Sequence, residues 1–145
     1  MKNIGILEIA KIERARKSCN SFLYIEKMLV EEKFDWLKCY IENDTLYAQG
    51  FLTPIGCKKR YKIQLAYSYF FPFRFDKILV VEPEIPFHPD IHMYNNKCLC
   101  LYYPGDLPLN RLTPLSTIVP WISEWLIKYE LWQRYKVWIG EAVKH

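Results

Sequence analysis

Two cysteines stand one residue apart in the stretch HMYNNKCLCLYYPGD, residues 92–106. A thiolate is a strong nucleophile and a good leaving group, so a reactive cysteine suits the transfer of an acyl group between carriers. The stretch and its approach also hold four zinc-type ligands, His88, His92, Cys98 and Cys100. The residues therefore allow covalent thiol chemistry or a metal centre, besides the common case of cysteine as a small buried apolar residue.

The spacing weighs against the metal centre. Zinc knuckles usually carry Cys-x-x-Cys rather than Cys-x-Cys, and downstream only His145 could add a ligand. A cysteine hydrolase would need a histidine as base, and His92 or His145 could serve if the fold brings one within hydrogen-bond reach of Cys100. We expect no bound metal and keep the zinc site and hydrolysis as alternatives.

The chain has 145 residues, five cysteines and a formal charge of +4, which predicts one domain over residues 1–145. The odd cysteine count and a first segment that turns charged early favour reduced thiols in the cytoplasm. No apolar run reaches membrane-spanning length. The densest basic run, CKKRYK at 57–62, alternates with apolar positions. We therefore expect neither a membrane nor a nucleic acid as a direct partner.

Hydrophobic periodicity predicts the elements that position the two cysteines. Helical spacing within residues 8–32 is carried by Phe22, Ile25, Met28 and Leu29. From residue 34 the period changes to two, and residues 34–52 predict two strands around a turn at Asn43 and Asp44. Further strands are predicted at 60–67 and 77–83. Together they form a four-stranded antiparallel meander with one face to be covered.

A long irregular segment separates the meander from a second helix. Six prolines between positions 83 and 114 exclude regular helix over residues 82–114, and a loop of that length is usually functional. Beyond it a helical apolar stripe begins at Trp121, with Pro120 in the first turn and an end near Gln133. The predicted fold is α+β, a meander flanked by N-terminal and C-terminal helices.

This order of elements and several motifs resemble the ubiquitin-conjugating enzymes. YFFPFRFDKILVVEP (69–83) resembles the family's Tyr-Pro-Phe segment before the fourth strand, and LCL (99–101) resembles its active-site motif. HMYNNKCLCLYYPGD followed by TIVPWISEWLIKYELWQRYKVWIGEAVKH is similar to bacterial relatives from anti-phage operons of the CBASS type. The resemblance covers residues 34–145 and implies a ubiquitin-conjugating-enzyme-like fold.

The resemblance also implies roles for individual residues. The family's His-Pro-Asn motif places its Asn eight residues before the active cysteine; Asp90 stands eight before Cys98, and His92 stands eight before Cys100. The bacterial relatives have His at this position, and only Cys100 lies between two leucines. Cys100 is therefore the predicted nucleophile, with its thiol accessible at the rim of the fold. His92 is the predicted donor to the oxyanion, and Cys98 is a neighbour without an assigned role.

Residues around the cysteines are candidate auxiliaries. Asp106 would line the entrance for an incoming amine, and Tyr94, Tyr102 and Tyr103 would order the loop or receive an extended peptide tail. No general base for Cys100 is apparent, and none is required because a small thiolate fraction is already very nucleophilic.

The function that the resemblance implies is that of a thioester carrier and transferase. Cys100 would hold the C-terminus of a partner protein, which in such operons is a nucleotidyltransferase of the cyclic GMP–AMP synthase (cGAS) type, and pass it to an amine that the sequence does not specify. The five glycines are isolated and form no phosphate loop, so we expect activation from elsewhere and no cofactor. The alternative is a non-catalytic binding module, since many relatives with this fold lack the cysteine.

Overall fold

The protein is described by a computed structural model that covers residues 21–70, 73–102 and 113–139. The predicted meander is confirmed. Its strands are β1 (Lys38–Glu42), β2 (Thr45–Leu52), β3 (Tyr61–Phe70) and β4 (Phe73–Glu82), paired antiparallel in the order β1-β2-β3-β4. Asn43 and Asp44 both have positive φ, 52° and 57°, which is the conformation of a two-residue turn whose twist suits a hairpin.

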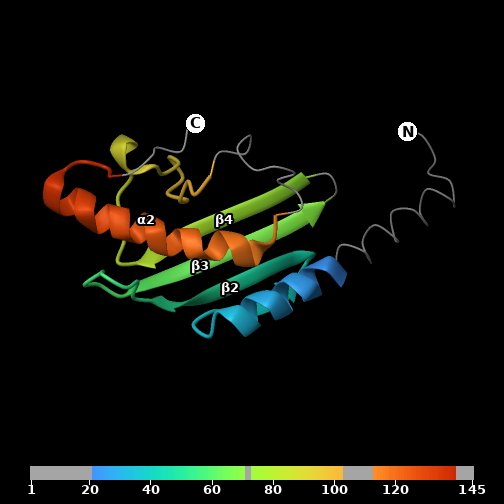
Figure 1. Cartoon of the computed structure of the whole chain (residues 1–145). Coiled ribbons are helices and arrows are strands. Elements are labelled where there is room, and N and C mark those ends of the chain that lie inside the picture. Colours follow the sequence, from blue (N-terminus) through green and yellow to red (C-terminus); the bar gives the residue numbers. More distant parts are fainter. Residues whose placement is uncertain (1–20, 71–72, 103–112, 140–145) are drawn as a thin grey trace, which may run out of the picture.

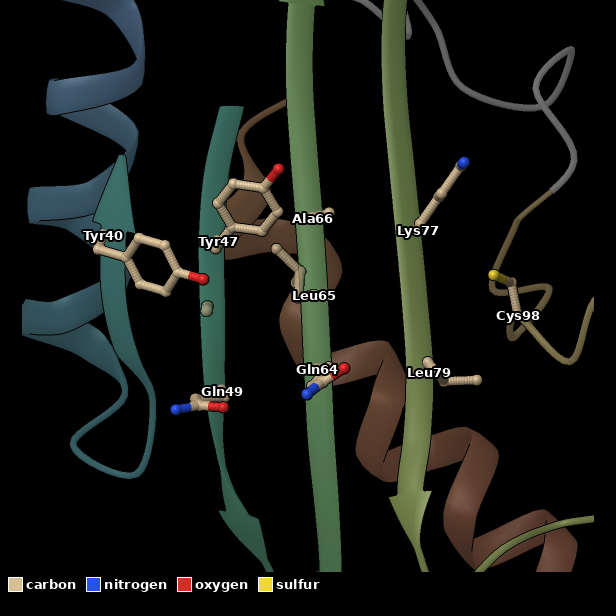
Figure 2. Close-up of a pocket in the computed structure, with 10 residues that line it drawn as sticks. Tyr40, Tyr47, Gln49, Gln64, Leu65, Ala66, Lys77, Leu79 and Cys98 are labelled. Atoms are coloured by element: carbon tan, nitrogen blue, oxygen red, sulfur yellow. The ribbon is translucent and has the colours of Figure 1, made fainter. Parts of the chain in front are cut away.

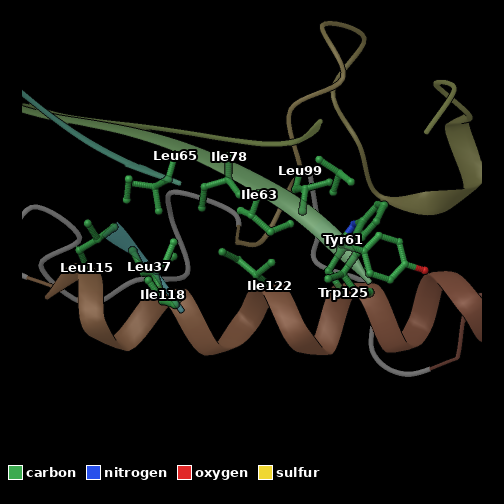
Figure 3. Close-up of a cluster of buried hydrophobic side chains, with 14 of the residues drawn as sticks. Leu37, Tyr61, Ile63, Leu65, Ile78, Leu99, Leu115, Ile118, Ile122 and Trp125 are labelled. Atoms are coloured by element: carbon green, nitrogen blue, oxygen red, sulfur yellow. The ribbon is translucent and has the colours of Figure 1, made fainter. Parts of the chain in front are cut away.

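The helix α2 (Leu115–Tyr135) covers one face of the sheet (Figure 1). Strand β3 alternates buried and more exposed residues, and its buried members Ile63 and Leu65 lie opposite Ile118 and Ile122 of the helix (Figure 3). This packing forms the core, because the apolar face of an amphipathic sheet must be covered by another element. The other face of the sheet carries the polar positions of each strand.

The start of α2 differs from the prediction. The helix begins at Leu115 rather than near Pro120, and it runs to Tyr135. Proline in a helix interior removes one hydrogen bond to the residue four positions earlier, here Ser116. Pro120 is exposed, so the carbonyl that loses its partner lies on the solvent side and the buried stripe continues past it.

The first described helix spans residues 21–33 and lies beside β1 (Figures 1 and 2). The helical spacing predicted this helix correctly but did not identify its buried face. Ile25 and Met28 are 57% and 67% exposed, whereas Leu23 and Val30 are fully buried. The predicted helical residues 8–20 lie outside the described part of the chain.

A buried carboxylate joins this helix to α2. Glu26 is 4% exposed, and its Oε2 accepts a hydrogen bond of 2.6 Å from the backbone N–H of Leu115. The N-cap residue Pro114 provides no side-chain cap. Because the first N–H groups of a helix lack intrahelical partners, Glu26 supplies the missing acceptor from a distant part of the chain.

Candidate functional site

Both cysteines lie on a short hairpin within the long irregular segment. The Cys100 N–H donates to the His92 carbonyl (N···O 3.1 Å), and the Tyr94 N–H donates to the Cys98 carbonyl (2.9 Å). Lys97 closes the turn with a φ of 71° and donates its N–H to the Tyr94 carbonyl (2.9 Å). The two arms therefore place His92 directly across from Cys100.

One arm of this hairpin is attached to the free edge of the meander. Cys98 pairs with Leu79 of β4, and the Leu99 N–H donates to the Ile78 carbonyl (2.8 Å). Leu99 is buried in the core cluster. Because consecutive residues of an extended segment point to opposite faces, Cys98 points to the other face, where its partner Leu79 also lies.

The Cys100 thiol is buried. The residue is 3% exposed, and its Sγ donates a weak hydrogen bond to the Tyr102 carbonyl (3.7 Å). Burial raises the pKa of the Cys100 thiol, while the hydrogen bond with the Tyr94 hydroxyl acts to lower it. The prediction that the Cys100 thiol is accessible is therefore wrong for this conformation, because the hairpin buries the Cys100 sulfur.

Tyr94 and Tyr102 are both close to Cys100. Burial and a hydrogen bond with Cys100 raise the pKa of Tyr94 to about 12. The Tyr102 hydroxyl donates to Asp76 of β4, and its ring meets that of Trp121 edge-on at 6.0 Å between centroids. Tyr102 thus ties the segment after Cys100 to both the sheet and α2.

His92 is held in place by its backbone and by its ring. It adopts a left-handed conformation (φ 51°), and its carbonyl accepts a second hydrogen bond, from Trp125 Nε1 of α2 (3.0 Å). Its imidazole packs against the ring of Trp138, with centroids 5.2 Å apart. A histidine at this place, opposite Cys100 and fixed by two tryptophans, has little freedom to change its orientation.

Cys98 has different surroundings from Cys100. It is half-buried and lines a hollow of 360 Å³ on the outer face of the sheet, together with Lys77 and Leu79 of β4 (Figure 2). Burial raises the pKa of the Cys98 thiol, and the positive charge of Lys77 opposes this effect. Cys98 therefore faces an open cavity on the outer face of the sheet.

The four zinc-type ligands do not converge. The His88 ring packs against Trp132 (4.8 Å between centroids), and its Nδ1 accepts from the Asp90 N–H (3.1 Å). Across residues 21–70, 73–102 and 113–139 no three side chains of His, Cys, Asp or Glu are placed to hold a metal ion. His145 lies outside these ranges. The described residues thus give no support to the zinc alternative.

The structure brings together four predicted residues, Cys100, His92, Tyr94 and Tyr102. Tyr103 and Asp106 lie outside the described residues. Sequence reasoning did not single out Lys77 as a site residue, although the period of two in residues 77–83 places Lys77 and Leu79 on one face. It also missed Trp138 as a contact of His92, because nothing in a single sequence relates a distal tryptophan to this histidine.

Comparison with protein families gives one match. A family model described as Type II CBASS E2 protein matches residues 26–145. This range includes the meander, the cysteine hairpin and α2, and it begins eight residues before the segment for which motifs predicted a resemblance. None of the curated proteins searched matches the chain. In the described part of the chain, every helix is too short or too polar to cross a membrane.

Proposed function

The chain belongs to the E2 family of type II CBASS, a bacterial anti-phage defence system, and from this premise we propose that it is a thioester carrier and transferase that uses Cys100. Cys100 lies within the matched range, and His92 faces it across the hairpin with an N···O distance of 3.1 Å between their backbones. This juxtaposition of a thiol and an imidazole-bearing residue is the observation that supports the proposal most strongly.

The proposed reaction has two acyl transfers. The Cys100 thiolate attacks the activated C-terminal carbonyl of a partner protein, the new C–S bond forms and the activating group leaves. An amine then attacks the thioester, the tetrahedral oxyanion collapses, the C–S bond breaks and the thiolate departs. The ammonium proton passes to solvent. Thiolate serves both steps because it is both nucleophile and leaving group.

His92 is the proposed donor to the oxyanion. One preorganised donor of this kind typically contributes about 3 kcal/mol to the transition state, or roughly a hundredfold in rate. Preorganisation is supported by the contacts that hold His92, namely its carbonyl bonded to Trp125 and its ring against Trp138. Such a residue would not need to reorient when negative charge develops.

Transfer requires that the covered thiol becomes accessible. Tyr94 is the residue whose movement would achieve this at least cost, because it is 45% exposed and sits next to the turn closed by Lys97. Its hydroxyl bonds to Cys100 in the closed arrangement. We infer that an incoming acyl donor displaces Tyr94, and that Tyr94 protects the thiol in the absence of a donor.

The proposed partner is a cGAS-like nucleotidyltransferase carried by its C-terminus. The test is co-incubation of the chain with that protein and its activating enzyme, followed by electrophoresis with and without thiol. The expected adduct disappears on reduction and is absent in Cys100→Ala. In Cys100→Ser the adduct becomes an oxyester that resists thiols. Cys39→Ala, which removes a half-buried cysteine on β1, is the matched control, and persistence of the adduct in Cys100→Ala would refute the proposal.

One observation favours a second candidate, a non-catalytic binding module. A thiol that is 3% exposed, with its pKa raised by burial, is also what a structural cysteine looks like. A module of this kind would bind the nucleotidyltransferase equally well as wild type and as Cys100→Ala, and neither would form a thiol-sensitive adduct.

A further inference from the structure

The outer face of the sheet contains a groove that the proposed function does not use. Its main hollow measures 360 Å³ and a second of 280 Å³ adjoins it. The floor is Ala66 of β3, whose register partners are Tyr47 on β2 and Lys77 on β4. A small residue between two long ones leaves a depression, because cross-strand partners project from the same face of the sheet.

The groove is lined by apolar residues and by several side chains that can form hydrogen bonds. Gln49 and Gln64 face each other across β2 and β3, and the rings of Tyr40 and Tyr47 stack at 5.1 Å between centroids. Side-chain amides donate and accept hydrogen bonds, as does the backbone of an extended peptide. The lining therefore suits an extended peptide segment.

Cys98 and Lys77 both line one wall of the groove. Cys98 pairs with Leu79, and Lys77 stands two residues before Leu79 on the same face. A diagonal neighbour at this spacing lies within reach of a long side chain. In Figure 2 the Cys98 sulfur points toward β4, from which Lys77 projects. Lys77 is exposed, and it forms no ion pair with a carboxylate of the described residues.

We propose that Cys98 and Lys77 form a second acyl-transfer pair, in which Cys98 accepts the acyl group of an activated peptide C-terminus and Lys77 captures that group as an amide. Lys77 is then a self-modification site, and the groove holds the peptide that precedes the acyl group. The inference goes beyond the proposed role of Cys100, since Cys100 takes no part in it.

The steps balance without any redox partner. The Cys98 thiolate attacks the carbonyl of a peptide thioester and forms a new C–S bond. The old C–S bond breaks, and the activating group leaves as a thiolate that takes a proton from solvent. The neutral amine of Lys77 then attacks the new thioester carbonyl, the C–S bond breaks, an amide C–N bond forms, and the amine proton returns to the thiolate or to solvent. The second step is intramolecular, and proximity of this kind raises the effective concentration of the amine greatly.

The experiment uses the full chain and a short synthetic peptide with a C-terminal thioester of mercaptoethanesulfonate. After incubation near neutral pH, hydroxylamine removes all thioesters, and mass spectrometry locates the amides that remain. We expect acylation of Lys77 to exceed that of the exposed Lys58 by about tenfold or more. Lys77→Arg should remove this signal, and Cys98→Ala should lower it to the level of Lys58. Cys39→Ala should leave it unchanged.

Several outcomes would overturn the inference. One is equal acylation of Lys77 and Lys58 in the wild type. Another is acylation of Lys77 that persists in Cys98→Ala. Cys98→Ser, which keeps the size of the side chain, serves as the second variant, and thermal unfolding followed by circular dichroism checks that both fold. Cys100→Ala should retain the Lys77 signal. If Lys77 acylation were lost in Cys100→Ala, the proposed Cys98–Lys77 pair would be refuted, but the proposed carrier role of Cys100 would not. A partner adduct that persists in Cys100→Ala would refute only the carrier role of Cys100.

Discussion

The thiol of Cys100 experiences two effects of opposite sign. Burial raises its pKa, and the hydrogen bond with the Tyr94 hydroxyl lowers it, with burial the larger effect. We therefore expect reactivity at this residue to require opening of the hairpin. Cys98, two residues away, faces the outer groove and the charge of Lys77 instead. The alternation of an extended segment gives neighbouring thiols of one motif separate surroundings.

Tyr94→Phe should reduce the reactivity of Cys100. The substitution keeps the ring but removes the hydroxyl that favours the thiolate, so the thiol pKa rises further. We expect alkylation of Cys100 by iodoacetamide to slow by about two- to fivefold near pH 8 and its pH profile to move upward. The measurement is mass spectrometry of the Cys100 peptide over a pH series. Tyr40→Phe is the matched control, and a profile that moves to lower pH would contradict the assignment.

His92→Asn tests how the oxyanion is stabilised. A histidine side chain changes charge near neutral pH and an amide does not. If the imidazole N–H is the donor, we expect the rate of transfer by the wild type to vary with pH between about 6 and 7.5. The rate of transfer by His92→Asn should not show this variation. His92→Ala should lose about a hundredfold in rate. Single-turnover discharge of the thioester to an amine gives these rates. Identical pH profiles for wild type and His92→Asn would count against the role of His92.

At the scale of elements, a tertiary contact replaces a local helix cap. Helix α2 begins after a proline that offers no side-chain acceptor, and Glu26 of the first helix accepts from Leu115 instead. A carboxylate at a helix N-terminus also meets the positive end of the helix dipole. The position of the first helix is thereby linked to the start of α2, and α2 in turn carries the tryptophan that bonds to the His92 carbonyl.

Glu26→Ala should destabilise the protein. It leaves a buried N–H of Leu115 without its charged acceptor, which costs about 2 kcal/mol. For a domain of this size that loss lowers the Tm by roughly 5 °C. Thermal unfolding monitored by circular dichroism measures the change. Glu26→Gln retains an acceptor oxygen and should lose less than Glu26→Ala. Glu32→Ala, at an exposed position of the same helix, is the control and should change little.

At the scale of the whole molecule, the sheet separates two environments. Helix α2 covers one face with apolar contacts, and the other face bears the groove lined by Cys98 and Lys77 (Figures 2 and 3). Glu130 of α2 accepts hydrogen bonds from the Lys58 N–H (2.9 Å) and the Tyr61 hydroxyl (2.8 Å). This contact holds the β2–β3 loop against the helix.

Glu130 should make the whole fold sensitive to acid. Although burial acts to raise the pKa of Glu130, the hydrogen bonds from Lys58 and Tyr61 lower it below its ordinary value of 4.5. A carboxyl whose pKa is lower in the folded state stabilises the protein above its unfolded pKa, and this stability is lost as pH falls through the folded pKa. We therefore expect the free energy of unfolding to fall between about pH 5 and pH 3 more steeply in the wild type than in Glu130→Gln.

Urea unfolding over that pH range measures this difference. Near pH 7 Glu130→Gln should be less stable than the wild type by about 1 kcal/mol, since its donors lose a charged acceptor. Glu32→Gln, at an exposed position of the first helix, should keep the wild-type pH dependence. Parallel curves for wild type and Glu130→Gln would show that the carboxylate does not contribute in this way.

The sequence by itself determined the family, the meander and the candidate reactive residues. Periods of two and 3.6, the Asn43–Asp44 turn and the LCL motif are local signals, and each reflects the backbone preference or chemistry of adjacent residues. These signals could not place the boundaries of α2, because Pro120 is tolerated there only through its exposure to solvent. Nor could they identify the buried face of the first helix, since Met28 and Leu23 are equally apolar and differ only in what lies beside them.

Only the tertiary structure decided which thiol is covered and which is open. Cys98 and Cys100 are equivalent in type and almost in position, but the pairing of Cys98 with Leu79 turns its side chain to the outer face beside Lys77. Cys100 instead is 3% exposed, and its thiol forms a hydrogen bond with Tyr94. Exposure and pKa depend on atoms contributed by distant parts of the chain, so they are fixed by packing and cannot be read from the spacing of two cysteines.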